Sequence, residues 1–435
     1  MCTLTTIVDD IFPRLLAWRR DFHLYAESGW LEFRTATLVA EELNRLGYQL
    51  QLGKQVINAD ARMGLPSEDT LKEQESRALQ QGALARWLPH FSGGFCGIVA
   101  NLETGRPGPV IAYRVDMDAL DQNEQQDNEH RPFREGFASC NPGMMHACGH
   151  DGHTAIGLGL AHVFMKLKSE LCGTIKLIFQ PAEEGTRGAK SMVAAGVVDD
   201  VDFFTAMHIG TDIPAGEIVC GCHGFMATTK FDATFRGVAS HAGARPEEGR
   251  NALLAAAQAS LALHCLSQHS GGDIRINVGV LQAGIGRNVV ADFARMKVET
   301  RGTSNEVNDF VYQQAQQVLH GAATMYGVEL DIALMGGAVS SQPTAPWVDY
   351  IRRQAETLPE FTSVIESLAT AMGSEDATYM MERVKTLGGQ SSYVIFGTDL
   401  SAGHHNEKFD FDERIMPVAV KTLATLALNI TNFKR

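Results

Sequence analysis

The residues best suited to chemistry are concentrated in one short stretch, Met145-His146-Ala147-Cys148-Gly149-His150-Asp151-Gly152-His153-Thr154. It holds a thiol, a carboxylate and several imidazoles, separated by small residues that let the backbone turn tightly. Thiolate and imidazole groups are ligands of transition metals such as zinc. Closed structural zinc sites use paired motifs, and the neighbouring sequence supplies no matching pair. The stretch therefore indicates a metal site that needs ligands from elsewhere in the chain.

Three distant stretches offer such ligands, and each is associated with an apolar run that predicts a β-strand. The runs cover residues 173–179, 202–208 and 393–396, and the polar residues at or beyond their ends are Glu183, Glu184, His208, His404 and His405. In open α/β sheets, polar residues at the carboxyl ends of the strands line the ligand crevice. We therefore expect these side chains to meet the first stretch at one edge of a sheet.

The chain contains six motifs that resemble those of the M20 metallopeptidases, in matching order. They are RVDMDAL (114–120), HACGHDGH (146–153), QPAEEG (180–185), SHAGARP (240–246), GSEDAT (373–378) and HNEKFDFDE (405–413). The Cys-Gly-His form of the second motif is similar to the amidohydrolase branch, which includes hippurate hydrolases, N-acyl-amino-acid hydrolases and plant auxin-conjugate hydrolases. The resemblance implies a metal-dependent hydrolase that cleaves the amide of an N-acyl amino acid.

The resemblance also implies a ligand set for two divalent metal ions per chain. Cys148 would bridge the two ions as a thiolate, and the further ligands would be His150 and His208 on one side and Glu184 and His405 on the other. Two such ions polarise a water and a carbonyl together, and Glu183 would act as the general base. The resemblance favours manganese, while the thiolate and imidazole ligands would equally suit zinc.

Two acidic residues before the metal stretch have different expected roles. Asp116 stands where the wider family has a metal-binding His, and the amidohydrolase branch takes its imidazole from His150 instead. We expect Asp118 to orient an imidazole ligand through a hydrogen bond. A structural carboxylate at a strand end is the alternative for Asp118.

The remaining histidines of these motifs divide into two pairs. His404 and His405 compete for one ligand position, and the spacing to Phe409 favours His405. His146 and His153 are expected in the core or behind the ligands, because the family ligands in that stretch are Cys148 and His150 alone.

Residues outside the metal set are also assigned by the resemblance. His241 would stabilise the developing oxyanion, often from a partner chain in related enzymes. Contacts with the substrate carboxylate are implied for Asn288, Arg301 and Ser374, because a guanidinium can hold a carboxylate through two hydrogen bonds. Arg287 is a further candidate for this task.

The elements that must position these residues follow two patterns. Before about residue 224, apolar helical and strand-like runs alternate, which is typical of a mostly parallel sheet covered by helices on both faces. From about residue 228 the order is β-α-β-β-α-β, a smaller α+β layer. We therefore predict an α/β catalytic domain formed by residues 1–224 and 338–435, and an inserted dimerisation or lid domain over 225–337.

Composition limits the partners. The chain has 435 residues, and its formal net charge of −14 disfavours nucleic acid and anionic membrane surfaces. We find no apolar run long enough to span a membrane and no signal peptide, so we expect a cytoplasmic protein.

Within the amidohydrolase branch, the chain most resembles the enzymes that split p-aminobenzoyl-glutamate, a folate breakdown product, into p-aminobenzoate and glutamate. Those enzymes are associated with manganese and with a related B subunit, so we expect either a homodimer or a heterodimer. Residues 53–92 form a longer segment than the corresponding stretch of the family. The sequence leaves its role open between shaping the rim of the active site, contacting another chain and surface decoration. The alternatives for the function are a broader, hippurate-type hydrolase and a metal-binding subunit that needs a partner chain.

Overall fold

The computed structural model describes residues 3–369 and 373–433. They form two compact units. The first contains residues 3–223, 341–369 and 376–433, and the second contains 224–340 and 373–375. Within the described ranges, no helix has the length and apolar character needed to cross a membrane.

The first unit is built on an eight-stranded sheet with the strand order β1-β2-β4-β3-β5-β14-β6-β12. Its four central strands are parallel: β4 (Thr174–Gln180), β3 (Val110–Asp116), β5 (Phe203–Ile209) and β14 (Gln390–Phe396). The antiparallel strands β2 (Ile98–Glu103) and β1 (Gln49–Leu52) continue it on one side, and β6 (Glu217–Val219) and β12 (Ser363–Ile365) on the other. The central strands are almost wholly buried, as expected of parallel strands covered on both faces.

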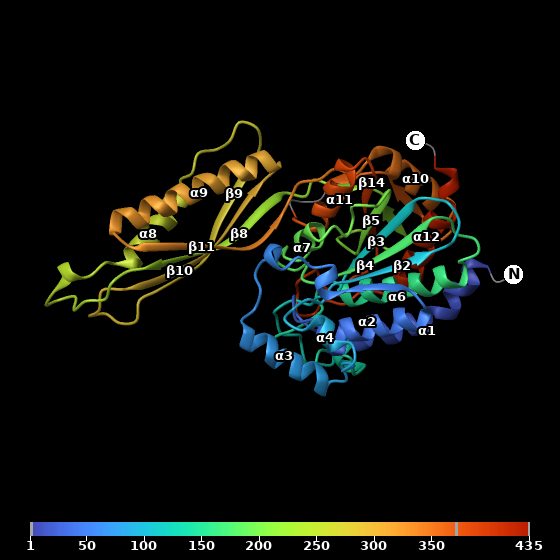
Figure 1. Cartoon of the computed structure of the whole chain (residues 1–435), viewed down its shortest axis with the longest axis horizontal. Helices are drawn as coiled ribbons and strands as arrows, with labels where there is room; N and C mark the ends of the chain where they lie inside the picture. Colours follow the sequence, from blue (N-terminus) through green and yellow to red (C-terminus); the bar gives the residue numbers. More distant parts are fainter. Residues whose placement is uncertain (1–2, 370–372, 434–435) are drawn as a thin grey trace. The chain divides into compact units, whose positions relative to one another are not determined.

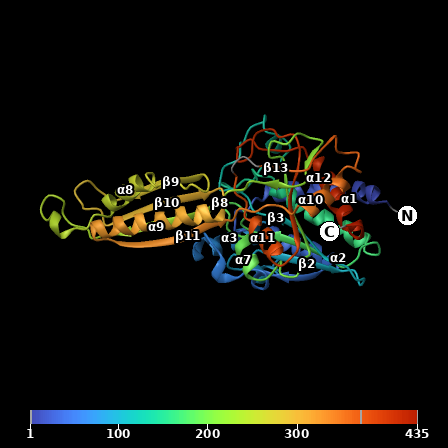
Figure 2. The ribbon, with the colours of Figure 1, turned by 90° about the horizontal axis from the view of Figure 1, so that it is seen from above.

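Helices cover both faces of this sheet (Figure 1, Figure 2). The long helix α6 (His150–Lys166) packs against β3 and β4, and around it lie α1 (Leu4–Leu24), α2 (Phe33–Leu46) and α12 (Ile415–Leu428). α10 (Ala345–Ala355) contacts α12 and β14. On the other face α7 (Ala189–Ala194) packs against α11 (Ala377–Thr386). The predicted α/β class with a mostly parallel sheet is confirmed.

Further elements complete the first unit. They are η1 (Gly53–Gln55), η2 (Ala59–Ala61), α3 (Glu68–Gln80), α4 (Leu88–Phe91), α5 (Arg131–Arg134), β7 (Cys222–His223), β13 (Leu368–Ala369) and η4 (Ile430–Asn432). α3 lies in the enlarged 53–92 segment and has a side-chain cap at its start. The Ser67 hydroxyl accepts the N–H of Thr70, and Glu68 and Asp69 lie in the first turn, where the helix dipole favours negative charge.

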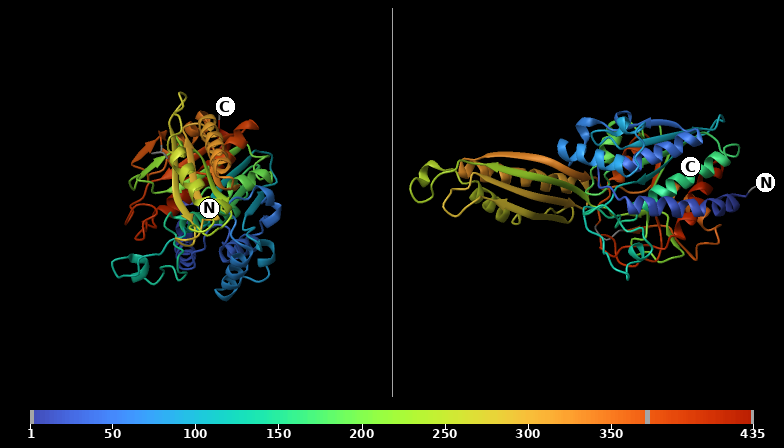
Figure 3. Two further views of the ribbon diagram at one scale, coloured as in Figure 1. Left: turned by 90° about the vertical axis from the view of Figure 1, so that its left-hand side faces the viewer. Right: turned by 90° about the horizontal axis from the view of Figure 1, so that it is seen from below.

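The second unit has the predicted β-α-β-β-α-β order. Its elements are β8 (Ala227–Arg236), η3 (Pro246–Glu248), α8 (Ala252–Leu263), β9 (Ile274–Ala283), β10 (Phe293–Gly302), α9 (Asn305–Tyr326) and β11 (Glu329–Ala338). The strands form one antiparallel sheet in the order β11-β8-β10-β9, with the two helices packed along it (Figure 3). A separate apolar core, rich in alanine from α8, holds this layer together.

The start of α6 lies within the stretch that carries the candidate metal ligands. The helix begins at His150, and Gly149 precedes it with a φ of 90°. A side chain is rarely tolerated at that φ, and a Cβ there would lie 2.9 Å from the Ile209 side chain. His150 and His153 therefore project from the first turn of a buried helix.

Candidate metal centre

The predicted metal ligands lie at the carboxyl edge of the parallel strands in the first unit. Glu183 and Glu184 follow the end of β4, His208 is the penultimate residue of β5, and His405 lies in the loop after β14. The first turn of α6 adds His150. Parallel strands end at the same sheet edge, so segments far apart in sequence converge there.

The ligand atoms form overlapping clusters. One cluster contains Cys148, Glu184 and His405, and its ligand atoms lie within 4.8 Å of one another. Cys148 Sγ also lies 3.4 Å from His208 Nε2, and Glu184 Oε1 lies 3.5 Å from His405 Nε2. His150 forms another cluster with Glu183 and Glu184. Cys148 thus lies between a His208 side and a Glu184 side, as expected of a ligand shared by two ions.

The hydrogen bonds of two histidines leave ring nitrogens available for a metal. His208 Nδ1 donates to the Ile209 carbonyl at 2.7 Å, so its Nε2 lone pair faces Cys148. His150 Nδ1 lies 3.3 Å from Asp118 Oδ1, and its Nε2 is buried with no hydrogen-bond partner among the described residues. Such second contacts fix the orientation of metal-binding imidazoles. Together with the buried Oε1 of Glu184, which has no hydrogen-bond partner among the described residues, these atoms fit divalent cations.

Burial and neighbouring charges shift the pKa values of the proposed ligands in different directions, and the Asp116 and Asp118 carboxylates raise the pKa of His150 well above its usual value despite its burial. Burial and the neighbouring Glu184 carboxylate raise the pKa of the Cys148 thiol. Burial and the surrounding imidazoles hold the pKa of His208 well below its usual value, so the ring is neutral. Metal ligation requires a thiolate and neutral imidazoles, and a divalent cation would stabilise the buried thiolate.

Asp118 connects the two sides of the site. Its Oδ1 accepts the backbone N–H of Glu183 at 3.0 Å, and its Oδ2 accepts that of Glu184 at 2.9 Å. The same Oδ1 lies 3.3 Å from Nδ1 of His150. Asp118 therefore fixes both the imidazole and the backbone from which the two glutamates project.

Glu32 is a supporting residue that sequence analysis missed. Its side chain is fully buried, and its Oε1 accepts the N–H of Ala182 at 2.7 Å. Ala182 and Thr186 have φ values of 53° and 60°, which are unfavourable for residues with a Cβ. Contacts such as that of Glu32 hold this strained loop, which contains both glutamates, in place. The only signal in the sequence is a single acid within the apolar run from Trp30 to Phe33.

Asp116 and His153 lie behind the ligands. Asp116 accepts from His153 Nδ1 at 2.6 Å and from Arg114 at 2.7 Å. His153 Nε2 in turn accepts the N–H of Ile209 at 3.1 Å. Both ring nitrogens of His153 are thus engaged, although its ring lies close to those of His150 and His208. The Asp116–His153 pair therefore holds the backbone at Ile209, the residue after His208.

His404 and His405 have different environments. His404 Nε2 accepts the N–H of Thr211 at 2.9 Å, and burial lowers its pKa to about 3. Its ligand atom also lies in a cluster with Cys148 and His208. The His405 side chain is about half exposed, and its backbone has a φ of 64°. His404 Nδ1 is buried without a hydrogen-bond partner among the described residues, so the geometry leaves His404 a candidate beside Cys148 and His208, while His405 is the imidazole beside Glu184.

His146 lies outside all these clusters. It is buried, neither ring nitrogen has a hydrogen-bond partner among the described residues, and burial lowers its pKa to about 4. These properties are those of a neutral core histidine beside the site.

The other predicted site residues belong to the second unit. His241 is exposed, and its Nδ1 accepts the N–H groups of Gly243 and Ala244. The Ala242 N–H donates to the Asn288 carbonyl at 3.1 Å, which brings the His241 and Asn288 loops together. Arg301 on β10 contacts Glu299 at 2.7 Å, and the Ser374 hydroxyl donates to the Met226 carbonyl at 2.9 Å.

A family model describes this combination of fold and site. Residues 112–429 match the model of peptidase family M20/M25/M40, so the chain belongs to this family. It is therefore a metal-dependent hydrolase of amide bonds. A dinuclear metal-binding peptidase of the M20 family from Bacillus subtilis has a similar structure, with a TM-score of 0.68, 25% identity, and coverage of 98% of this chain and 100% of that one.

More similar proteins narrow the comparison. The A subunit of the p-aminobenzoyl-glutamate hydrolase of Escherichia coli is 64% identical over 99% of this chain and 98% of its own length. An indole-3-acetyl-aspartic acid hydrolase of Enterobacter agglomerans is 62% identical with the same coverage. The crystal structure of an aminobenzoyl-glutamate utilization protein from Klebsiella pneumoniae has a TM-score of 0.86 and 55% identity, over 97% of both chains.

Proposed function

We propose that the chain hydrolyses the amide between an aromatic carboxylic acid and an acidic amino acid, with p-aminobenzoyl-glutamate as its substrate. The observation behind this proposal is the pair of relatives at 64% and 62% identity. Their names describe different acyl groups and different amino acids. The named substrates nevertheless share an aromatic acyl part and a dicarboxylic amino acid, and this shared chemistry defines the substrate class.

The proposed metal ligands are Cys148, His150, Glu184, His208 and His405, with Asp118 orienting His150. Two divalent cations, when bound, would polarise the amide carbonyl and favour ionisation of the attacking water. The ligand clusters support this assignment, as does the buried Nε2 of His150, which has no hydrogen-bond partner in the described part of the chain.

Glu183 is the proposed general base. Its Oε2 lies 4.0 Å from His150 Nε2, so the carboxylate is directed toward the centre of the site. It would accept a proton from the attacking water and then deliver that proton to the amino-acid nitrogen as the C–N bond breaks. The products are a free carboxylic acid and a free amino acid.

The second unit would contribute the remaining groups. His241 would stabilise the oxyanion that develops on the amide carbonyl. Asn288, Arg301 and Ser374 would hold the substrate carboxylate, with Arg301 as the cationic contact. The exposed position of His241 supports a role toward a bound molecule rather than in the core.

Manganese is the proposed metal, with zinc as the alternative that suits the same ligands. The Escherichia coli relative is named as one of the subunits of its enzyme, which supports a related partner chain. A homodimer is the other assembly under test. We place the reaction in the cytoplasm, as expected from the sequence.

The substrate proposal is tested by measuring product release from a matched panel. The purified chain, stripped of metal and resupplied with Mn²⁺ or Zn²⁺, is given p-aminobenzoyl-glutamate, indole-3-acetyl-aspartate and hippurate. We expect kcat/KM to be highest for p-aminobenzoyl-glutamate and lowest for hippurate, which lacks the second carboxylate. Preference for hippurate would overturn the substrate class. Inactivity on all three with metal bound would indicate a required partner chain.

A further inference from the structure

Arg19 of α1 is a fully buried arginine that contacts three carboxylates. Its guanidinium lies 2.8 Å from Asp151, 2.8 Å from Asp410 and 3.3 Å from Glu413. The side chain has no exposed surface, and the three acids are also almost entirely buried. Their charges raise the pKa of Arg19 despite its burial. A buried charge is costly unless it is paired, so this arrangement requires all its members together.

The three acids belong to the two segments that contain the metal ligands. Asp151 directly follows His150 on α6, while Asp410 and Glu413 follow His405 in the C-terminal loop. Arg19 therefore joins the His150 segment to the His405 segment through side chains. More than two hundred residues separate the two segments in the sequence, so they are joined only by non-covalent contacts.

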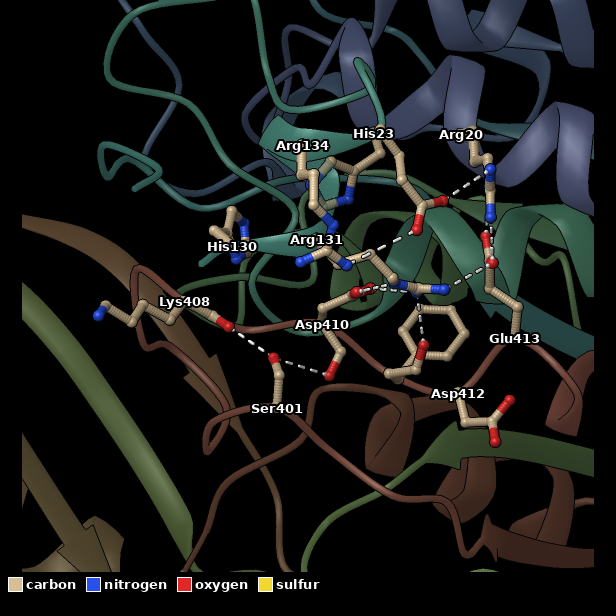
Figure 4. Close-up of polar contacts among 12 residues, drawn as sticks. Arg20, His23, His130, Arg131, Arg134, Ser401, Lys408, Asp410, Asp412 and Glu413 are labelled. Atoms are coloured by element: carbon tan, nitrogen blue, oxygen red, sulfur yellow. Dashed lines mark hydrogen bonds and ion pairs between the residues drawn. The ribbon is translucent and has the colours of Figure 1, made fainter. Parts of the chain in front are cut away.

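The C-terminal loop is held at both ends. At one end, the N–H of His405 donates to the Ala147 carbonyl at 2.8 Å, and His405 has the strained φ of 64°. At the other end, Arg131 contacts Asp410 and Glu413 from outside, and Arg20 contacts Glu413 at 2.7 Å (Figure 4). Arg131 and Arg20 are partly exposed, whereas Arg19 is fully buried and contacts Asp151 as well as the two acids of the loop. The buried His23 also contacts Asp151, at 2.8 Å.

We propose that Arg19 is a positioning residue for the metal ion held by Cys148, Glu184 and His405. It would keep His405 at the correct distance from Cys148 by fixing the loop after His405 to the helix of His150. The planar guanidinium can contact three carboxylates at once, whereas a lysine ammonium is a compact charge without this fork. Without that link, the His405 side of the site should loosen while the His150 and His208 side stays intact.

The test measures Mn²⁺ binding to the metal-free full-length chain, with unbound Mn²⁺ counted by its aqueous electron paramagnetic resonance signal. We expect two ions to bind the natural chain. The second ion is the one held by Cys148, Glu184 and His405, and the first is the one on the His150 and His208 side. In Arg19→Lys, we expect the Kd of the second ion to rise at least tenfold and the Kd of the first ion to change less than threefold. In the control Arg20→Lys, which alters a contact with the same Glu413, both values should stay within threefold. Equal weakening of both ions in Arg19→Lys, or no change, would overturn the positioning role.

Two further variants distinguish a folding defect of Arg19→Lys and a wrong ligand assignment from a failure of the proposal itself. If Arg19→Lys does not fold, as judged by circular dichroism, Asp410→Asn replaces it with the same expected loss of the second ion. Its unchanged binding would equally overturn the role. The inference rests on the proposed ligand set, which His405→Ala tests directly. Retention of the second ion in His405→Ala would refute the ligand assignment, whereas its loss there but not in Arg19→Lys would refute only the role of Arg19.

Discussion

Asp118 and Glu183 are joined through the backbone: the N–H of Glu183 donates to Oδ1 of Asp118 at 3.0 Å. The same carboxylate accepts the N–H of Glu184 and faces the Nδ1 of His150. One side chain thus sets the orientation of a proposed base, a carboxylate ligand and an imidazole ligand. The proposed base and the proposed carboxylate ligand both depend on an acid that would itself touch neither metal nor substrate.

Asp118→Asn should lower the metal affinity or the kcat of the enzyme without unfolding it. An amide keeps only one acceptor oxygen, so one of the two backbone N–H groups loses its partner. We expect a loss of about 10- to 100-fold in metal affinity or in kcat, the usual effect of removing a contact behind a metal ligand. Metal content and steady-state kinetics measured on the same preparation check this. Unchanged values of both would show that Asp118 has only a structural role.

His404→Ala and His405→Ala should differ in metal binding. His404 already accepts the Thr211 N–H, so its loss should lower stability while both ions still bind. His405→Ala should lose one of the two ions, because it removes the imidazole beside Glu184. Metal content after dialysis against buffered Mn²⁺ distinguishes the variants. The reverse pattern would make His404 the ligand.

Glu32 should make the stability of the metal-free chain depend on pH. Burial and the neighbouring Asp118 raise its pKa from 4.5 to about 8. Between these values the folded state binds a proton that the unfolded state has released, so the free energy of unfolding falls as pH rises from about 4.5 to about 8. Glu32→Gln should flatten this dependence, because glutamine stays neutral. Urea unfolding at pH 5 and pH 8 measures it, and equal slopes in both proteins would contradict the prediction.

Part of this site could be predicted from the sequence and part could not. The convergence of Cys148, His150, Glu184 and His208 follows from residue types at the ends of apolar runs. The distinction between His150 and His153 came from the family resemblance and not from residue type, because both lie on one helical turn and only the hydrogen bonds of each ring separate them. Contacts between distant residues were also missed.

The contact of Arg19 with Asp410 illustrates why. The two residues are 391 positions apart, and neither the periodicity of α1 nor the composition of the C-terminal loop indicates a partner. A buried arginine on an amphipathic helix has the same sequence pattern as an exposed one. The overall α/β order was predictable because it depends on short-range patterns of apolar residues, whereas such pairings depend on the completed packing.

The central claim is that this chain itself performs the hydrolysis with Glu183 as its base. The most direct measurement is the kcat of Glu183→Gln on p-aminobenzoyl-glutamate, compared with the natural chain and with Glu170→Gln, which changes an exposed carboxylate. We predict that Glu183→Gln still binds two metal ions and loses about 10²- to 10⁴-fold in kcat, the usual contribution of a general base. Glu170→Gln should retain full activity. Full turnover by Glu183→Gln, with both metal ions bound, would contradict the account.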